Sequence, residues 1–483
     1  MSGFPAFLSR RSICHISGSS SVKSIPHLLA AQSNFESFIA ILDRHSYTSC
    51  SLQVTCIPFP LTRPRFCDKP ESWVFLGNNR QATKENRINL SFSYYLPTRI
   101  IFGPGKLKEL ADTPHLPGKK ALIVIGASGA MKEYGYLDRV AWYLKQNGVD
   151  SVVYDKIIPN PVSEHVEEGA AFARENRCDF ILGLGGGSTI DSAKSIAVMA
   201  KNPGKYWDYI SGGSGGGKKP AKGALPIVAV PTTAGTGTEA DQWTVITKTD
   251  TKEKIGWGND STFPVLSIVD PELMLSVPFS ITAHTGMDAF FHAAEAYLST
   301  MNNPVSDHLA LEAISLITDF LPIAVEDGGN LEARTYLAWA STEAGICESL
   351  SSCISQHSIE HALSAYYPEV PHGSGLAMLS ISYFKFLAEK YADRFPDMAM
   401  AMGENIHAME LKKDMSFSFI VGLKKLLKRI GLNAEKLSDY GVRKGDLQLI
   451  AENAFYTMGD LFEATPVKMT VQDVVSVLEE AYD

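Results

Sequence analysis

The sequence predicts an α/β fold, in which a parallel-sheet domain is followed by an all-helical domain. Between residues 88 and 272, short apolar runs alternate with amphipathic helical patterns, which is the signature of βαβ units. From about residue 273 to the end the pattern is helical, for example over 306–316 and 415–430. We therefore expect two folded domains, at 88–272 and 273–483.

The first strands and helices of the series follow from their periodicities. Residues 121–125 form an apolar run, and residues 137–146 have the spacing of an amphipathic helix. Residues 152–154 and 162–176 repeat this strand-then-helix order. Strands joined by helical crossovers run parallel, and both faces of such a sheet are covered.

A glycine turn follows the next predicted strand, at residues 179–184. The turn is Gly185-Gly186-Gly187-Ser188, and a helix is predicted to begin at Thr189. Backbone N–H groups at such a junction bind anions, assisted by the helix dipole. Three glycines and a serine taken alone indicate a structural turn about as often as a phosphate site, and they do not form the common GxGxxG motif. The strand-to-helix context favours a pyrophosphate site and hence a dinucleotide.

A second polar loop follows the predicted strand at 227–230. Residues 231–239 are rich in threonine and glycine, which suits contacts to a ribose and a nicotinamide edge. Helix-capping threonines in an ordinary loop would give the same composition. Residues 244–247 and 254–257 are predicted to pair as a hairpin.

Acidic and imidazole side chains with helical spacing lie in the second domain. Asp288 and His292 are four residues apart, as are His357 and His361, so each pair shares one helix face. His372 lies in a Pro-His-Gly turn. A single histidine is more often a core or surface residue than a ligand, but one carboxylate with several imidazoles is the ligand set of a catalytic divalent transition metal.

Together these motifs resemble the iron-containing (group III) alcohol dehydrogenases, over about residues 90 to 483. The resemblance implies a dehydroquinate synthase-like fold, with the active site between the dinucleotide-binding α/β domain and a helical metal-binding domain. The matching segments, in the order of the family, are 96–105, 159–161, 185–194, 231–239, 270–273, 285–297 and 371–373.

The resemblance also implies site residues. The metal ligands would be Asp288, His292, His357 and His372, and His361 would be a catalytic histidine beside the substrate. One residue more than in familiar members separates His361 from Pro371, so His361 is the alternative third ligand. The expected cofactor-binding positions are Gly126, Ser128, Asn160, Gly185, Gly186, Gly187, Ser188, Asp191, Thr232, Thr233, Thr236 and Lys254.

The function implied is hydride transfer between NAD(P)(H) and a primary alcohol or aldehyde. Fe²⁺ is the family's usual metal, and Zn²⁺ suits the same ligands. Many NAD-using relatives carry an Asp after the first strand, where it repels a 2′-phosphate. Gly126 occupies that place here, so NADP is permitted as well as NAD. The alternatives are a polyol (glycerol-type) dehydrogenase and a non-catalytic nucleotide- or metal-binding protein.

Composition limits the possible partners. The net charge of −9 is not that of a basic, nucleic-acid-binding protein, and no uninterrupted apolar run is long enough to span a bilayer. We therefore expect a small-molecule substrate, neither nucleic acid nor membrane as a partner, and, from the family, a homodimer. The scattered cysteines fit a reducing compartment such as the cytoplasm.

Residues 1–87 match no part of the family. They contain ten Lys and Arg residues against five Asp and Glu residues, and residues 1–35 contain no acid. This composition is typical of an organelle transit peptide, in which case the location would be an organelle. A mis-assigned start or a disordered tail are the other interpretations.

Overall fold

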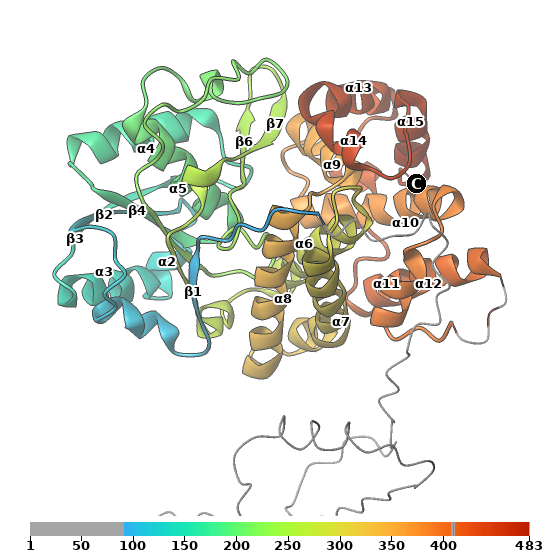
Figure 1. The fold of residues 1–483 in the computed structure, drawn as a ribbon, viewed down its shortest axis with the longest axis horizontal. Helices are drawn as coiled ribbons and strands as arrows, with labels where there is room; N and C mark the ends of the chain where they lie inside the picture. The colour runs from blue at the N-terminus through green and yellow to red at the C-terminus, as the bar shows by residue number, and fades with distance from the viewer. Residues whose placement is uncertain (1–90, 407–408, 410, 483) are drawn as a thin grey trace, which may run out of the picture. The chain divides into compact units, whose positions relative to one another are not determined.

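The structure is a computed structural model that describes residues 91–406, 409 and 411–482 (Figure 1). The extension predicted over residues 1–87, with its possible transit segment, lies outside the described residues. In Figure 1 the first half of the described chain, coloured blue to green, forms a sheet with its helices, and the second half, coloured yellow to red, is helical.

The sheet has six strands, and every pairing within it is parallel. In spatial order the strands are β1 (Arg99–Phe102), β8 (Leu266–Val269), β5 (Ile227–Pro231), β4 (Phe180–Gly185), β2 (Lys120–Gly126) and β3 (Asp150–Ile157). This arrangement, followed by a helical domain, confirms the predicted fold class.

Helices cover both faces of the sheet. They are α3 (Tyr136–Gln146), α4 (Ser163–Glu175) and α5 (Gly187–Lys201). On β2, Leu122 and Val124 belong to the core cluster shared with α4 and α5, whereas Ile123 and Ile125 belong to the cluster shared with α3. Because successive residues of a strand point to opposite faces, a strand covered on both sides is apolar throughout.

Smaller elements complete this half. The predicted hairpin is present as β6 (Thr244–Lys248) and β7 (Glu253–Trp257), which pair antiparallel. Short helical turns are α2 (Ala130–Glu133), η1 (Lys106–Ala111), η2 (Tyr206–Asp208), η3 (Asp260–Thr262) and η4 (Pro271–Met274).

The second half packs its helices around one large apolar core. Its helices are α6 (Phe279–Leu298), α7 (Pro304–Glu326), α8 (Leu331–Leu350), α9 (Ser355–Tyr366), α10 (His372–Lys390), α11 (Phe395–Ala401), α12 (Lys412–Arg429), α13 (Leu447–Met458), α14 (Asp460–Ala464) and α15 (Val471–Glu480), with short turns η5 (Leu437–Tyr440) and η6 (Lys444–Asp446).

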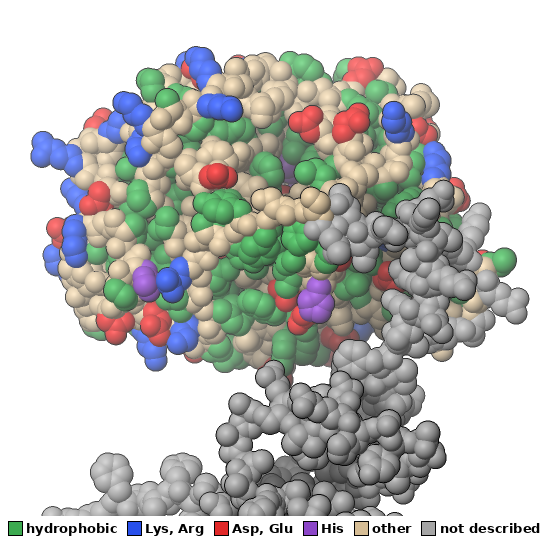
Figure 2. Space-filling model, viewed as in Figure 1, with side chains coloured by type: hydrophobic (Ala, Val, Ile, Leu, Met, Phe, Trp, Pro, Cys, Tyr) green, Lys and Arg blue, Asp and Glu red, His purple; other side chains and the backbone are tan. Residues whose placement is uncertain are grey.

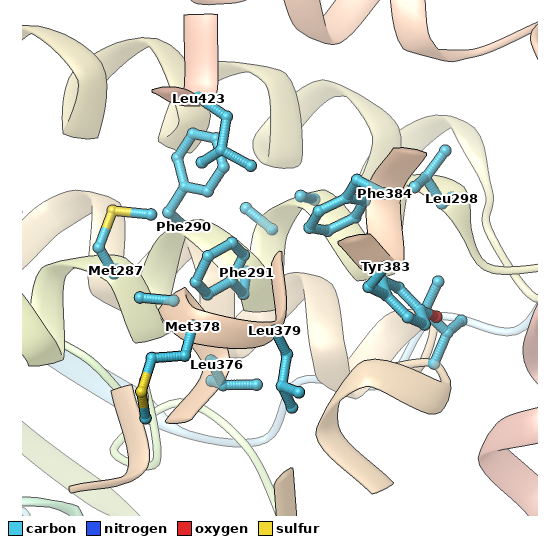
Figure 3. Packing of buried hydrophobic residues seen from close by; sticks show 14 of the residues in the cluster. Met287, Phe290, Phe291, Leu298, Leu376, Met378, Leu379, Tyr383, Phe384 and Leu423 are labelled. Carbon is cyan, nitrogen blue, oxygen red and sulfur yellow. The ribbon is translucent and has the colours of Figure 1, made fainter. Parts of the chain in front are cut away.

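Aromatic residues of α6 hold this core together (Figure 3). Phe291 stacks on Phe384 of α10 with ring centroids 6.0 Å apart, and Phe290 stacks on Phe419 of α12 at 6.1 Å. Phe290 and Phe291 are fully buried, so they pack in the core although they are sequence neighbours of the predicted ligands. Their packing fixes the helix on which Asp288 and His292 lie.

Helix α7 is the one helix in the described part of the chain that is long and apolar enough to cross a membrane. It is only partly buried, but its inner residues, such as Ile314 and Ile317, lie in the same core as α6. A core helix passes the same test of length and composition, so the finding is weak evidence for a membrane span.

Two contacts of the backbone of loop 231–239 join the sheet half to α8 of the helical half. A Cβ added to Gly345 of α8 would lie 2.2 Å from the carbonyl oxygen of Gly237, so only glycine fits at position 345. Nearby, the Gly235 N–H donates a hydrogen bond to Oγ of Ser341 at 2.7 Å. The threonine- and glycine-rich loop is therefore fastened directly to α8. A further contact between the halves is made by α9 and α13, which pack against β7.

Candidate active site in the cleft

A cavity of about 1430 Å³ lies between the sheet half and the helical half. Ten of the twelve predicted cofactor positions line it: Gly126, Ser128, Asn160, Gly186, Gly187, Ser188, Asp191, Thr233, Thr236 and Lys254. The other two, Gly185 and Thr232, do not line it. They join the two loops instead, since the Thr232 N–H donates to the Gly185 carbonyl at 2.9 Å.

The glycine turn has the form of an anion site. Strand β4 ends at Gly185 and α5 begins at Gly187, with no side chain capping the helix. The N–H groups at the start of α5 are thus presented at the cavity, where the helix dipole favours a phosphate. A Cβ at position 187 would lie 2.3 Å from the methyl group of Thr236, so glycine allows the two loops to meet.

Buried charges on α5 hold the second loop in place. Asp191 accepts hydrogen bonds from the Thr238 hydroxyl at 2.7 Å and from the Val245 N–H at 2.9 Å. Lys194, which is fully buried, donates to Asp241 at 2.8 Å and to the Trp243 carbonyl at 2.6 Å. These contacts explain why an apolar helix core contains an Asp and a Lys.

The predicted metal ligands converge around one carboxylate. Asp288 and His292 lie on α6, His357 on α9, and His372 begins α10. Asp288 Oδ1 is 3.2 Å from His372 Nε2, 3.6 Å from His357 Nε2 and 3.8 Å from His292 Nδ1. All four side chains line the cavity.

The donor atoms of this cluster fit a divalent cation. Asp288 Oδ1, His292 Nδ1 and His357 Nε2 are buried and have no hydrogen-bond partner among the described residues. A buried polar atom without a partner costs about 1–3 kcal/mol. Burial opposes the charge on Asp288, but the nearby imidazoles of His292 and His372 hold the pKa of its carboxyl well below the usual value. A bound cation would satisfy all three atoms at once.

Two further carboxylates orient the imidazoles. Glu295 Oε1 is 2.6 Å from His357 Nδ1, and Glu360 is hydrogen-bonded to His372 Nδ1. Carboxylate–histidine pairs of this kind fix the ring of a metal ligand. Neither residue was predicted from the sequence, although Glu295 follows His292 by three and Glu360 follows His357 by three, which is the spacing of one helix face.

His361 lies beside the cluster rather than around Asp288. Its ring centroid is 5.3 Å from that of His372, and its Nδ1 is 3.0 Å from the sulfur of Met458. Burial and the charge of Lys254 lower the pKa of His361 well below its usual value. Asp288, His357 and His372 form one group whose donor atoms lie within 4.8 Å of one another, whereas His361 groups with Glu360 and His372 and not with Asp288. This geometry favours His357 as the third ligand.

The predicted cofactor residue Lys254 connects the two halves of the site. It lies on β7, and its Nζ is 2.8 Å from Ser364 Oγ and 3.4 Å from Glu360 Oε2. Asn160 also crosses the cleft, since its side-chain amide donates to the Pro368 carbonyl at 3.0 Å.

Two cavity residues near His292 were not predicted. Glu348, at the end of α8, has Oε2 3.6 Å from His292 Nε2, and burial raises the pKa of its carboxyl to about 7. Cys353 is 3% exposed and lies close to His292 and His357. Burial and the neighbouring Glu348 raise the pKa of the Cys353 thiol well above its usual value. No spacing in the sequence distinguishes these residues from other glutamates and cysteines.

Comparison with known proteins identifies the family. Residues 97–271 match the family described as iron-containing alcohol dehydrogenase, and residues 282–482 match the C-terminal domain of the same family. The chain belongs to the iron-containing alcohol dehydrogenase family. The resemblance stated from the sequence is thereby confirmed.

The chain matches relatives in this family over nearly the whole length of those relatives. The chain is 33% identical to the NAD-dependent methanol dehydrogenase of Bacillus methanolicus over 392 residues, which is 80% of this chain and 99% of that protein. It is 35% identical to the 1,3-propanediol dehydrogenase of Klebsiella pneumoniae over 395 residues, 81% of this chain and 99% of the relative.

Solved structures of the family share the fold. An archaeal halo-thermophilic alcohol dehydrogenase from a Red Sea brine pool is 34% identical, with a TM-score of 0.78, over 82% of this chain and 100% of that one. A 1,3-propanediol oxidoreductase gives a TM-score of 0.75 at 34% identity, over 81% and 100% of the two chains. As a family member the protein is a metal-dependent oxidoreductase that transfers a hydride between NAD(H) and an alcohol/aldehyde pair. The predicted class of enzyme is confirmed.

Proposed function

We propose that this protein interconverts short primary alcohols and aldehydes, with Fe²⁺ at the four predicted ligands and NADP(H) or NAD(H) as hydride carrier. The single observation that carries the proposal is the convergence of Asp288 and the imidazoles in the same cavity as the glycine turn at Gly186–Ser188. The hydride donor and the substrate oxygen must meet in one place, and this cavity offers sites for both.

We propose Asp288, His292, His357 and His372 as the ligands of the metal. When bound, the cation lowers the cost of a negative charge on the substrate oxygen and polarises a carbonyl. Glu295 and Glu360 keep two of the imidazoles in the orientation that ligation requires. The same donor set accepts Zn²⁺, so metal content and activity must be measured together.

We assign the cofactor to the sheet side of the cavity. The pyrophosphate would lie at the start of α5, close to Gly187 and Ser188, and the ribose and nicotinamide would follow the loop that contains Thr233 and Thr236. The nicotinamide would then lie toward the side of the cavity that contains the metal ligands. Closure of the cleft around the two ligands would exclude water from the hydride transfer.

We propose that His361 contacts the substrate side and carries the alcohol proton outward. The support is its place in the cavity next to His372, outside the group centred on Asp288. His361→Ala is expected to lower kcat while the protein keeps its full metal content. Parallel loss of metal and turnover would show instead that His361 is a ligand.

The cofactor preference depends on position 126. No carboxylate is present there, and a Cβ on Gly126 would meet nothing closer than the Ile157 carbonyl at 3.7 Å. Nearby Lys132 is paired with Asp155 at 2.5 Å. We propose that NADP(H) is accepted and preferred. The kcat/KM ratio for NADPH over NADH tests this, and Gly126→Asp, for which there is room, should shift the ratio toward NADH by repelling the 2′-phosphate. A strong NADH preference of the unaltered protein would refute the proposal.

The decisive experiment is cofactor oxidation with a panel of short aldehydes, using anaerobically purified, iron-loaded protein. Turnover that chelation abolishes, and that iron or zinc restores, would establish the function and the working metal. Turnover only with polyols would favour the glycerol-type alternative, for which the similarity to 1,3-propanediol dehydrogenases is a reason. Failure with both substrate classes, despite bound metal, would leave a non-catalytic role.

We also propose that the protein is a cytoplasmic homodimer. The support for an interface is apolar surface. Figure 2 shows hydrophobic side chains gathered near β1 and α8, and Tyr94 and Tyr95 before β1 are about half exposed. Light scattering on the purified protein tests the dimer. Imaging of the tagged full chain tests the location, with an organelle as the other outcome if residues 1–35 are a transit peptide.

A further inference from the structure

A second set of metal-binding side chains lies next to the cluster centred on Asp288. It consists of Glu348 at the end of α8, Cys353 in the short segment before α9, and the two histidines His292 and His357. The sulfur of Cys353 and ring nitrogens of both histidines lie within 4.8 Å of one another. All four side chains line the cavity.

The two histidines present nitrogen atoms to both sets. His292 has Nδ1 3.8 Å from Asp288 Oδ1 and Nε2 3.6 Å from Glu348 Oε2, so its ring lies between the two carboxylates. Its ring is nearly parallel to that of His357, with centroids 4.4 Å apart. His292 and His357 are thus shared by the two sets, and one cation at a time can engage them fully.

Two of the buried ring nitrogens, which also face Asp288 Oδ1, are available to either set. His292 Nδ1 and His357 Nε2 have no hydrogen-bond partner in the described part of the chain, and the two residues are 5% and 3% exposed. The Cys353 thiol is free of any disulfide and equally buried. A lone thiol would be an ordinary core residue, but here it lies beside two unsatisfied imidazoles and a carboxylate.

We propose that Cys353 and Glu348, with His292 and His357, form a sulfur-containing binding position for a thiophilic divalent cation such as Zn²⁺, Co²⁺ or Cd²⁺. Thiolate, imidazole and carboxylate ligands are the set that zinc prefers, whereas the Asp288 set has no sulfur. On binding, the S–H bond of Cys353 breaks, the sulfur–metal bond forms, and the proton leaves to solvent, while Glu348 binds as the carboxylate.

The consequence is a means of distinguishing metals within one cavity. A hard or borderline cation such as Fe²⁺ is held at the Asp288 set, and a softer cation is drawn toward Cys353. Occupation of the sulfur position removes His292 and His357 from the Asp288 set. Excess zinc or cadmium would therefore inhibit an iron-loaded enzyme by relocating shared ligands. This inference rests on the metal centre of the proposed function, but it does not depend on the substrate.

The test is spectroscopic and uses the full chain. Metal-free protein is titrated with Co²⁺, and the sulfur-to-cobalt charge-transfer absorption is followed in the near ultraviolet. The variants are Cys353→Ser and Cys353→Ala, with Cys347→Ser as the matched control. Cys347 is also a buried thiol, but its Sγ faces the Ser306 carbonyl at 3.4 Å and it does not line the cavity. Circular dichroism verifies that each variant is folded.

We expect the absorption in the unaltered protein and in Cys347→Ser, and its loss in both Cys353 variants, which still bind cobalt at the Asp288 set. Equal absorption with and without Cys353, or none in the unaltered protein, would overturn the proposal. An enzyme that is active with iron but lacks the band contradicts only the sulfur position. A Cys353-dependent band in a protein without turnover contradicts only the proposed function.

Discussion

Glu295 and His357 lie on different helices, yet a carboxylate oxygen of Glu295 is 2.6 Å from Nδ1 of His357. Glu295 is fully buried on α6, seven residues after Asp288, and also accepts a hydrogen bond from the Ile354 N–H at the start of α9. One side chain therefore fixes both the position of α9 and the orientation of its ligand imidazole. With Nδ1 engaged, Nε2 of His357 is left for the metal.

We predict that Glu295→Gln weakens metal binding. The amide cannot stabilise the imidazole as a carboxylate does, and loss of such partners costs about 10–100-fold in metal affinity. Competition with a chelator measures the affinity directly. Glu332→Gln, at an exposed position of α8, is the control and should behave as the unaltered protein. Equal affinities in the two variants would contradict the orienting role.

Removing the metal should lower thermal stability. A ligand that binds only the folded state stabilises it by mass action, by about 2.7 kcal/mol when its free concentration is 100 times its Kd. We expect chelation to reduce the midpoint of thermal unfolding, and added Fe²⁺ to restore it. Asp288→Asn should make the midpoint insensitive to both treatments. A midpoint that does not respond in the unaltered protein would mean that no cation is bound there.

The buried pair of Lys194 and Asp241 should be costly to break. Both side chains are at most 2% exposed, and their atoms are 2.8 Å apart. Lys194→Met leaves a buried carboxylate without its partner, which we expect to destabilise the fold by about 3–5 kcal/mol in urea unfolding. Lys145→Met breaks an exposed pair with Asp150 and should leave the unfolding midpoint unchanged. Similar midpoints for the two variants would refute the assignment.

Glu343 should make stability fall as pH rises. It is 1% exposed on α8, and one of its carboxylate oxygens has no hydrogen-bond partner among the described residues. Burial, with a smaller effect of Glu312, raises the pKa of Glu343 from 4.5 to about 8. Between these values the unfolded chain has lost a proton that the folded chain retains, so the contribution of this group to stability decreases with rising pH.

The corresponding variant is Glu343→Gln. It should be as stable as the unaltered protein near pH 4.5 and more stable by roughly 2–4 kcal/mol above pH 8, since one pKa unit corresponds to about 1.4 kcal/mol. Chemical unfolding at a series of pH values measures the difference. A difference that does not grow with pH would show that the carboxylate is already neutralised by another group.

The sequence predicted the sheet where periodicity was strong. The apolar runs that form β2, β4 and β5 are buried on both faces. A continuous apolar run predicts such a strand even when the neighbouring strands are not known. Strand β1 was covered only by the family segment 96–105, and β8 was not predicted. Each has only four residues, and their pairing joins Arg99 to Leu266, far apart in the chain. Such pairing is set by tertiary packing rather than by local pattern.

The site was predictable in the same uneven way. Helical spacing placed Asp288 and His292 on one face. Only the fold, in which α10 packs against α6 and Glu295 of α6 binds the start of α9, brings His357 and His372 to them. Spacing also could not reveal the carboxylates around them. Glu295 and Glu360 have the same chemical identity as many exposed glutamates, and only the fold shows that both are fully buried. Their role in orienting His357 and His372 follows from contacts that only the structure shows.

The backbone contact between Gly237 and Gly345 has a consequence for motion. Gly235, two residues away, also packs tightly against Thr285, three residues before Asp288 on α6. The loop 231–239, which we assign to the nicotinamide side, therefore packs tightly against both α6, which carries Asp288, and α8, which carries Glu348. We expect this junction to act as the fulcrum of any opening and closing of the cleft, because displacement is least at a pivot. Opening of the rim would then break the hydrogen bond between Asn160 and the Pro368 carbonyl, while the distance between hydride donor and acceptor stays nearly constant.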